Sequence, residues 1–393
     1  MVYLYSDIIT QAGGIETYLH ALATTLDAEG IPFRVAVSEQ RPTEAPCALL
    51  DDLEAQGIDV YRQPYVPGDR WRVRKRLLMY WLWWKLEPGD WVYCVRQPLA
   101  GLYLDLVRLV HNRGAKIAAS WMFAPEFLVP DPPHYESFCR AVEETDRVIS
   151  VSECTTHQFE EVYGYDGPVE VVRYHNLPLF DEPVPLPEGP PWRIGYMGRL
   201  SIEQKNLDTL IRAFQRLRTN GVEAELHFYG GGDDEEILAA QAQDLGVASS
   251  VHFHGPYDHR TDLPAIMADN HVFTYTSNYE GGPCFTLLEL LQAGRYVVAS
   301  PVGGIPDIYE GHPEAGILVD PDDPAAITRG LETAIMRLRE SVVDPTSIRR
   351  RYAEEFDIHA AHKDWQSAMC PKGDENGKVS LNGFVNFGVE KDG

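Results

Sequence analysis

Residues 271–304 read HVFTYTSNYEGGPCFTLLELLQAGRYVVASPVGG, and this stretch decides the fold class. The β-branched and aromatic residues of 271–277 predict a strand, and the glycines and proline of 278–284 predict a turn. Leucines over 285–293 predict a helix, and the glycine that follows is a suitable C-cap. Residues 296–300 are apolar and predict a second strand. The stretch is therefore a strand–helix–strand unit with a glycine-rich loop at the helix N-terminus.

The loop carries groups that suit a nucleotide sugar. The first turn of a helix has unpaired N–H groups and a partial positive charge, so it attracts phosphate. Gly281 and Gly282 allow an anion to approach the backbone closely. Glu280 and Glu289 frame the loop, and a carboxylate accepts hydrogen bonds from a pair of vicinal hydroxyls. Phosphate and diol together describe a nucleotide sugar; the alternative is that both glutamates are solvated surface residues.

Composition limits the class of protein. A length of 393 residues is enough for two domains of ordinary size. No apolar run approaches the roughly 20 residues of a membrane span. A formal net charge of −25 argues against general nucleic-acid binding. The six cysteines are scattered without a CxxC pair, which favours reduced thiols in a cytoplasmic protein over disulfides or a zinc site.

The first half of the chain alternates strands with helices. Residues 2–9 lack the charged start of a signal peptide and are expected to form the first strand. A glycine turn and a helical pattern over 15–26 follow. Gly13 and Gly14 could admit a phosphate or a sugar at the start of that helix, or they could simply make a tight turn. The alternation continues to 169–174, which indicates a parallel doubly wound sheet.

Residues 70–86 read RWRVRKRLLMYWLWWKL, with a basic first half and an apolar, aromatic second half. One interpretation is a helix whose second half packs against the sheet. The other is a peripheral contact with an anionic membrane, at its cytoplasmic face, in which tryptophans lie at the interface. The residues of that contact would be Arg70, Arg72, Arg74, Lys75, Arg76, Trp81, Trp83 and Trp84.

The second half repeats the alternation after a proline-rich segment. We expect a first domain over 1–178, a linker over 179–192 and a second domain over 193–346. A C-terminal helix over 347–370 and a flexible tail over 371–393 would complete the chain. The expected fold class is α/β with two Rossmann-like, doubly wound domains.

Two cations lie in the loop after the first strand of the second domain. Gly198, Arg199 and Lys205 belong to this loop, and ligands of open α/β sheets bind at the carboxyl ends of strands. Arg binds a diphosphate with two hydrogen bonds and Lys acts as a point charge, although both could serve only solubility. The acidic run 233–236 suits a helix N-terminus better than a metal site. His254 follows a strand and could face a ligand or belong to the core.

Several motifs together resemble one family. GGIETYL at 13–19, GYMGRLSIEQKNLDTLIRAF at 195–214 and SNYEGGPCFTLLELLQAG at 277–294 are similar to those of retaining glycosyltransferases of family 4, which have the GT-B fold. The resemblance covers roughly residues 1–370 and is more specific in the second half. It implies two domains facing across a cleft, with the C-terminal helix crossing back to the first.

The resemblance also implies roles for individual residues. Arg199 and Lys205 would bind the donor diphosphate, Glu289 the ribose hydroxyls and Glu280 the donor sugar. The backbone of Gly282, Pro283, Cys284 and Phe285 would hold sugar and phosphate, and Gly13 and Gly14 would close on the phosphate. No metal or cofactor is implied.

The sequence departs from the family pattern in three places. Eight residues rather than seven separate Glu280 from Glu289, and Arg199 and Lys205 are one residue further apart than usual. The usual first-domain histidine is absent, and Ser120, Trp121 or Met122 stands in its place.

The implied activity is transfer of a hexose-type sugar, with retention, from a nucleotide-diphosphate sugar to a lipid-linked, polysaccharide or small-molecule acceptor. The alternatives are a nucleotide-sugar 2-epimerase and a non-catalytic protein that binds nucleotide sugars.

Overall fold

A computed structural model describes residues 1–9, 14–39, 47–63, 71–98, 102–122, 132–175, 177–259, 261–282 and 284–369. The chain forms two compact units. Unit 1 contains residues 1–151 and 156–175 and the chain from Ala361 onward, and unit 2 contains residues 152–155 and 176–360. None of the described helices is long and apolar enough to cross a membrane.

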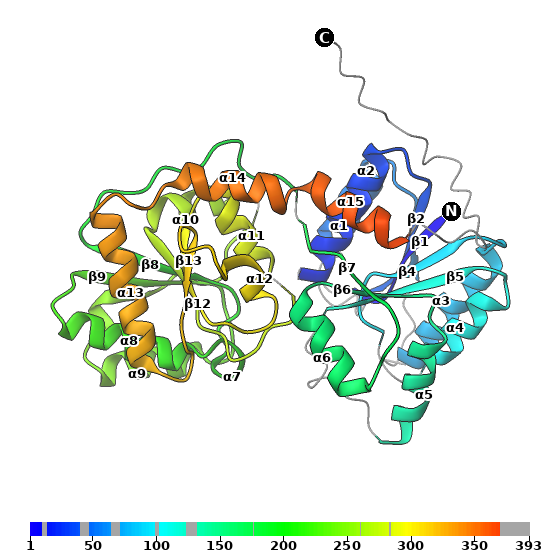
Figure 1. Cartoon of the computed structure of the whole chain (residues 1–393), viewed down its shortest axis with the longest axis horizontal. Coiled ribbons are helices and arrows are strands. Elements are labelled where there is room, and N and C mark those ends of the chain that lie inside the picture. The colour runs from blue at the N-terminus through cyan, green and yellow to red at the C-terminus, as the bar shows by residue number, and fades with distance from the viewer. Residues whose placement is uncertain are drawn as a thin grey trace, which may run out of the picture. The chain divides into compact units, whose positions relative to one another are not determined.

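Unit 1 is built on a sheet with helices around it (Figure 1). Its strands are parallel and have the order β3-β2-β1-β4-β5-β6-β7. Its expected first strand is confirmed as β1, whose central residues are fully buried. The elements are β1 (Val2–Ile9), α1 (Gly14–Ala28), β2 (Phe33–Glu39), α2 (Ala48–Ala55), β3 (Val60–Gln63), α3 (Trp71–Lys85), β4 (Trp91–Cys94), α4 (Tyr103–His111), β5 (Lys116–Trp121), α5 (Pro132–Glu143), β6 (Arg147–Ser150), α6 (Glu153–Tyr163), β7 (Val169–Val171) and the C-terminal α15 (Ile358–Met369).

Unit 2 repeats this design, with helices around a central sheet (Figure 1). Its strand order is β10-β9-β8-β11-β12-β13, again with parallel pairs. Both sheets therefore have the doubly wound order expected from the alternation of strands and helices. The elements are β8 (Trp192–Met197), α7 (Ile202–Lys205), α8 (Leu207–Thr219), β9 (Ala224–Tyr229), α9 (Glu235–Asp244), the 3₁₀ helix η2 (Ala248–Ser250), β10 (Val251–Phe253), α10 (Leu263–Asp269), β11 (Val272–Tyr275), α11 (Phe285–Gln292), β12 (Tyr296–Ala299), α12 (Ile305–Tyr309), β13 (Gly316–Leu318), α13 (Pro324–Arg339) and α14 (Pro345–Glu355).

The stretch 271–304 folds as predicted, into β11, α11 and β12. Every residue of α11 except Thr286 is buried, because the helix is enclosed by its own unit and packs against α14. Gly294 ends the helix with φ +72°, where a Cβ atom would lie 2.5 Å from the Pro345 carbonyl oxygen. Glycine is thus required there by conformation and by space.

The proline-rich segment before β8 belongs to unit 2 and is fixed to it. Arg295 is fully buried, and its guanidinium donates to the carbonyl oxygens of Val184 and Pro185, each at 2.7 Å. Gln292 accepts a hydrogen bond from the Leu179 N–H at 2.8 Å. The segment is therefore a strap on the surface of unit 2.

The expected single helix over 347–370 is divided into α14 and α15. Ala361 marks the point where the chain returns to unit 1. The tail expected over 371–393 lies outside the described residues.

Candidate functional site

The candidate site lies where the strand order of unit 2 reverses. β8 and β11 are neighbours in the sheet, but the chain continues from them toward opposite edges. In such sheets the loops after these two strands diverge and leave room for a ligand at the carboxyl edge. Here Asn278, after β11, donates from its N–H to the Gln204 carbonyl oxygen and from its side chain to that of Glu203, each at 2.8 Å. These two hydrogen bonds connect the segment after β8, which carries Arg199 and Lys205, to the loop after β11, which carries Glu280.

Glycines let neighbouring loops approach along this edge. Gly230 has φ +134°, and a Cβ atom there would lie 2.0 Å from the Gly198 carbonyl oxygen. A Cβ atom on Gly232 would similarly lie 2.1 Å from the Leu200 carbonyl oxygen. The Gly198 N–H in turn donates to the Tyr229 carbonyl oxygen at 2.9 Å. The loop that carries Arg199 is thus positioned by its backbone.

Lys205 and Glu280 form an ion pair, although 75 residues separate them. The side chain of Lys205 is 11% exposed and that of Glu280 is 7% exposed. Glu280 also accepts a hydrogen bond from the Ser277 hydroxyl at 2.6 Å. Arg199 is exposed and donates to the amide oxygen of Gln204, and it forms no ion pair within the described part of the chain. The charge of Lys205 is therefore balanced by a carboxylate, whereas the guanidinium of Arg199 is available to a ligand.

Glu289 lies on α11, the helix after β11, and is fully buried. One carboxylate oxygen, Oε1, lies 2.5 Å from His259 Nε2. The other, Oε2, is buried and has no hydrogen-bond partner among the residues that the structure describes. Burial, with the charge of Glu289, raises the pKa of Tyr257 well above its usual range. A buried carboxylate oxygen without a donor is costly, so Glu289 suits a ligand that supplies a hydroxyl.

The N-terminus of α11 faces the same loop region. Gly281 accepts a hydrogen bond from the Gly304 N–H at 2.7 Å, and a Cβ atom on Gly303 would lie 2.3 Å from the Gly281 carbonyl oxygen. Cys284 is the N-cap residue and makes no side-chain cap hydrogen bond. Burial is the main cause that raises the pKa of its thiol to about 12, so the thiol is protonated at neutral pH. Gly282 and Phe285 are buried, and Pro283 lies outside the described residues.

The predicted site residues of unit 1 are Gly13, Gly14 and the three residues in place of the family histidine. Gly14 is exposed and begins α1, whereas Gly13 lies outside the described residues. The three residues in place of the family histidine are all buried. The Ser120 hydroxyl bonds with the Tyr93 hydroxyl at 2.6 Å, and Trp121 packs against Phe138 in the core. Met122 is 3% exposed.

Helix α3 confirms the packing interpretation of residues 70–86. Leu78, Leu82 and Leu86 are fully buried in the core of unit 1. Arg74 and Lys75, expected among the membrane-contacting cations, are buried instead, and Lys75 pairs with Asp7. That expectation is wrong for both residues.

Trp81 is also unsuited to a membrane contact, because its ring stacks on that of Tyr61 with 4.0 Å between centroids. Arg70 lies outside the described residues. Among the side chains of α3 that the structure describes, the exposed ones are Arg72, Val73, Arg76, Leu77, Tyr80, Trp83, Trp84 and Lys85.

Other sequence features have structural explanations. Asp234 accepts a hydrogen bond from the Ile202 N–H at 2.7 Å, which supports the start of α7 and agrees with a structural interpretation of the acidic run. His254 is exposed and stacks on Tyr229. The cysteines at 47, 94, 139, 154 and 284 are free thiols, as the scattered spacing predicts.

Sequence reasoning missed His259 and Ser277, which hold the two glutamates. His259 lies outside the motifs quoted above, and Ser277 begins the motif at 277–294 without any sign in the sequence that it contacts Glu280. The only sequence signal is position: His259 follows β10 and Ser277 follows β11, at the edge where ligands bind.

Two family models match the chain in succession. Residues 12–173 match the model described as "Glycosyltransferase Family 4", and residues 191–337 match "Glycosyl transferases group 1". The chain belongs to glycosyltransferase family 4. In this family 4 chain, the second match contains Arg199, Lys205, Glu280 and Glu289.

Curated relatives support the same family. The chain is 30% identical over 184 residues to a glycogen synthase of Halorhodospira halophila, which covers 44% of this chain and 36% of the relative. It is 35% identical over 134 residues to a GDP-mannose-dependent alpha-(1-6)-phosphatidylinositol monomannoside mannosyltransferase of Mycolicibacterium smegmatis, covering 32% of this chain and 34% of the relative. These matches span about a third of each relative's length.

Solved structures support the GT-B fold over nearly the whole family 4 chain. HepE of Anabaena, solved in complex with UDP, aligns with a TM-score of 0.71 at 18% identity, covering 94% of this chain and 99% of that one. The lipopolysaccharide outer core galactosyltransferase WaaB, in its apo form, aligns with a TM-score of 0.70 at 22% identity and the same coverage.

Proposed function

We propose that this protein transfers a hexose-type sugar from a nucleotide-diphosphate sugar to a glycan, lipid-linked or small-molecule acceptor, with retention at the anomeric carbon. The observation that carries the proposal is the arrangement at the carboxyl edge of β8 and β11. There Lys205 and Glu280 form an ion pair, and their loops are tied together by Asn278. Glu289, in the helix that follows, keeps a buried oxygen that has no hydrogen-bond partner among the described residues.

Each part of a nucleotide-sugar donor finds a complementary group in this arrangement. The Oε2 atom of Glu289 can accept a hydrogen bond from a ribose hydroxyl. Arg199, Lys205 and the first N–H groups of α11 suit a diphosphate. Solved HepE of the same fold contains UDP and, in another crystal, UDP-glucose. Glu280 lies beside Lys205 and is expected to contact the donor sugar.

The chemistry follows from the charge that develops in the reaction. When the bond between the anomeric carbon and the diphosphate oxygen breaks, negative charge collects on the leaving diphosphate. The two cations and the α11 N-terminus stabilise that charge, and one such donor contributes about 3–4 kcal/mol in other enzymes. The Cys284 thiol, whose pKa is raised to about 12, is protonated and unsuited to be a nucleophile.

A thermal-shift panel of nucleotides and nucleotide sugars identifies the donor, because a ligand that binds the native state raises its melting temperature. The best donor is then incubated with and without candidate acceptors, and the anomeric configuration of the product is read by NMR. Retention in an acceptor-dependent product supports the proposal. A sugar that changes without an acceptor indicates the epimerase, and tight binding without turnover indicates the non-catalytic protein.

We also propose, as a place of action, a peripheral contact with an anionic membrane through the exposed side of α3. Val73, Leu77, Tyr80 and Trp84 recur at helical spacing, and all four are at least 40% exposed. Aromatic residues with nearby cations suit a lipid interface.

Sedimentation with anionic liposomes at low salt tests this contact. Trp84→Ser is expected to weaken binding, whereas Arg108→Ser, at an exposed ion pair on α4, is the control and should leave it unchanged. No sedimentation of the wild type would remove the idea.

A further inference from the structure

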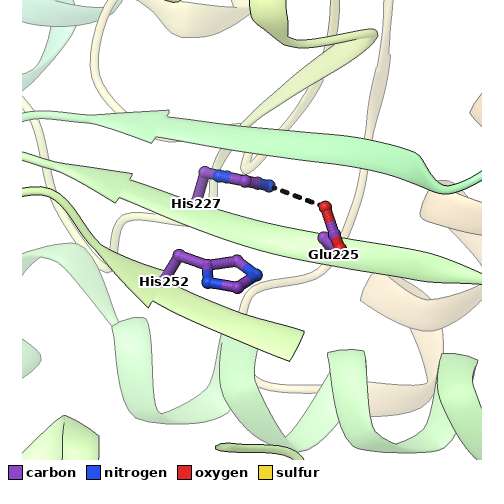
Figure 2. A group of neighbouring side chains, drawn as sticks. All are labelled: Glu225, His227 and His252. Atoms are coloured by element: carbon purple, nitrogen blue, oxygen red, sulfur yellow. Dashed lines mark ion pairs between the residues drawn. The ribbon is translucent and has the colours of Figure 1, made fainter. Parts of the chain in front are cut away.

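One face of strands β9 and β10 gathers imidazole and carboxylate groups that are not part of the candidate donor site. His227 and His252 are partners in the parallel register, and Glu225 lies two residues before His227 on the same strand face. Figure 2 shows the three side chains on this face. One ligand atom from each lies within 4.8 Å of the other two. Neighbouring strands hold such a set rigidly, since their spacing is fixed by backbone hydrogen bonds.

The imidazole ring of His227 is oriented by a neighbouring histidine and lies close to Glu225. His227 Nδ1 lies 3.0 Å from His254 Nε2. This contact orients the His227 ring, as a hydrogen bond to the non-coordinating nitrogen does in metal sites. Its other nitrogen, Nε2, lies 3.4 Å from Glu225 Oε2.

A simple stack of rings does not account for the cluster. His254 stacks on Tyr229 with 4.4 Å between centroids, which explains its own position. His252 Nε2, however, is buried and has no hydrogen-bond partner within the described part of the chain. A buried polar atom without a partner costs free energy, and a cation shared with His227 and Glu225 would remove that cost.

We propose that Glu225, His227 and His252 bind a divalent transition-metal ion, for which Zn²⁺ is the probe, with water in the fourth position. Two histidines and a carboxylate are a ligand set that Zn²⁺ uses in proteins. Tetrahedral bonds of about 2.0–2.1 Å place ligand atoms roughly 3.3 Å apart. The present separations, all within 4.8 Å, would have to shorten by up to about 1.5 Å to reach that geometry.

The ion would fasten the edge strand β10 to β9. β10 has only three residues and pairs with β9 alone in the described sheet. It leads directly to the loop with Tyr257 and His259, and His259 contacts Glu289. Arg193 of β8 lies in register with Glu225 of β9. Its positive charge would lower the affinity of the site for a cation. The ion has no role in the transfer step, and the inference does not depend on the proposed activity.

The test uses the full chain without a polyhistidine tag, after dialysis against EDTA. Zn²⁺ is titrated by calorimetry, and Co²⁺ is titrated by visible absorption, where tetrahedral coordination gives intense bands. The wild type is expected to bind one equivalent with those bands. His252→Asn and Glu225→Gln should each weaken binding at least tenfold. His312→Asn is the control, because His312 is a half-exposed histidine of the same unit that lies 3.0 Å from Glu314; it should bind like the wild type.

Circular dichroism and melting of the metal-free variants verify folding. If a variant fails to fold, the wild-type Co²⁺ spectrum and a rise in melting temperature with one equivalent of Zn²⁺ decide the question alone. Wild-type protein that takes up less than half an equivalent overturns the proposal. So does an octahedral Co²⁺ spectrum, or equal affinity in folded His252→Asn and His312→Asn variants.

Discussion

Replacing Glu289 by glutamine separates binding from folding at the candidate site. The carboxylate is fully buried, with Oε1 against His259 and Oε2 without a partner among the described residues. Glutamine keeps the shape and one acceptor oxygen but removes the charge and the second acceptor. A hydrogen bond to a charged group is worth about 1.5–3 kcal/mol. The loss of one such bond to a ribose hydroxyl should therefore raise the Kd for the cognate nucleotide about 10- to 100-fold.

The same substitution should not lower the stability of the ligand-free protein. A buried charge with an unpaired oxygen is costly, and the amide oxygen of glutamine can still accept from His259. We expect a melting temperature equal to or above that of the wild type. Glu332→Gln, a substitution at a glutamate of α13 that accepts a hydrogen bond from Asn220, is the matched control and should leave nucleotide affinity unchanged.

Calorimetry with the nucleotide and its 2′-deoxy and 3′-deoxy analogues completes the experiment. If Glu289 binds the diol, one analogue should bind wild type and Glu289→Gln with nearly equal affinity, because the interaction that the substitution removes is already absent. Unchanged affinity for the natural nucleotide, together with a lower melting temperature, would show that Glu289 serves only the fold and would refute the reasoning.

Three further predictions follow from other contacts. Lys205→Met should lower turnover at least 100-fold, because it removes a cation from the leaving diphosphate and leaves Glu280 unpaired; turnover near the wild-type value would contradict this. Gly230→Ala should lower the free energy of unfolding by at least about 1–3 kcal/mol in denaturant titrations, since its Cβ would lie 2.0 Å from a carbonyl oxygen. Gly221→Ala is the control, because Gly221 has φ +83° but open space around it, and this variant should lose less. Burial lowers the pKa of His175 to about 4, so between pH 6.5 and 4 the unfolded state binds a proton that the folded state does not. The free energy of unfolding should therefore fall by up to about 3 kcal/mol as the pH drops through this range. His175→Phe should flatten that fall, and an unchanged pH profile in this variant would exclude His175 as its cause.

The parts of the fold that depend on local pattern could be predicted from the sequence. The helix over 285–293 is found as α11, Phe285–Gln292, because its leucines and following glycine are local signals. The strand over 296–300 is found as β12, Tyr296–Ala299. The alternation of such elements is enough to predict parallel sheets, since a parallel pair requires a crossover helix.

Pairings across long sequence separations could not be predicted in the same way. Lys205 and Glu280 were both candidates, but their ion pair depends on how two loops after different strands fold. His259 contacts Glu289 only because the loop after β10 returns over the sheet edge. On α3, helical spacing alone could not show that Arg74 and Lys75 lie inward, because Asp7, the partner of Lys75, comes from β1.

The strap formed by the proline-rich segment determines how the chain can be dissected. An isolated fragment of unit 2 that began at Trp192 would remove two carbonyl acceptors from the buried guanidinium of Arg295. Unsatisfied donors of this kind cost about 1–3 kcal/mol each, more when charged. A fragment that begins before Leu177 retains these acceptors, so expression boundaries belong there.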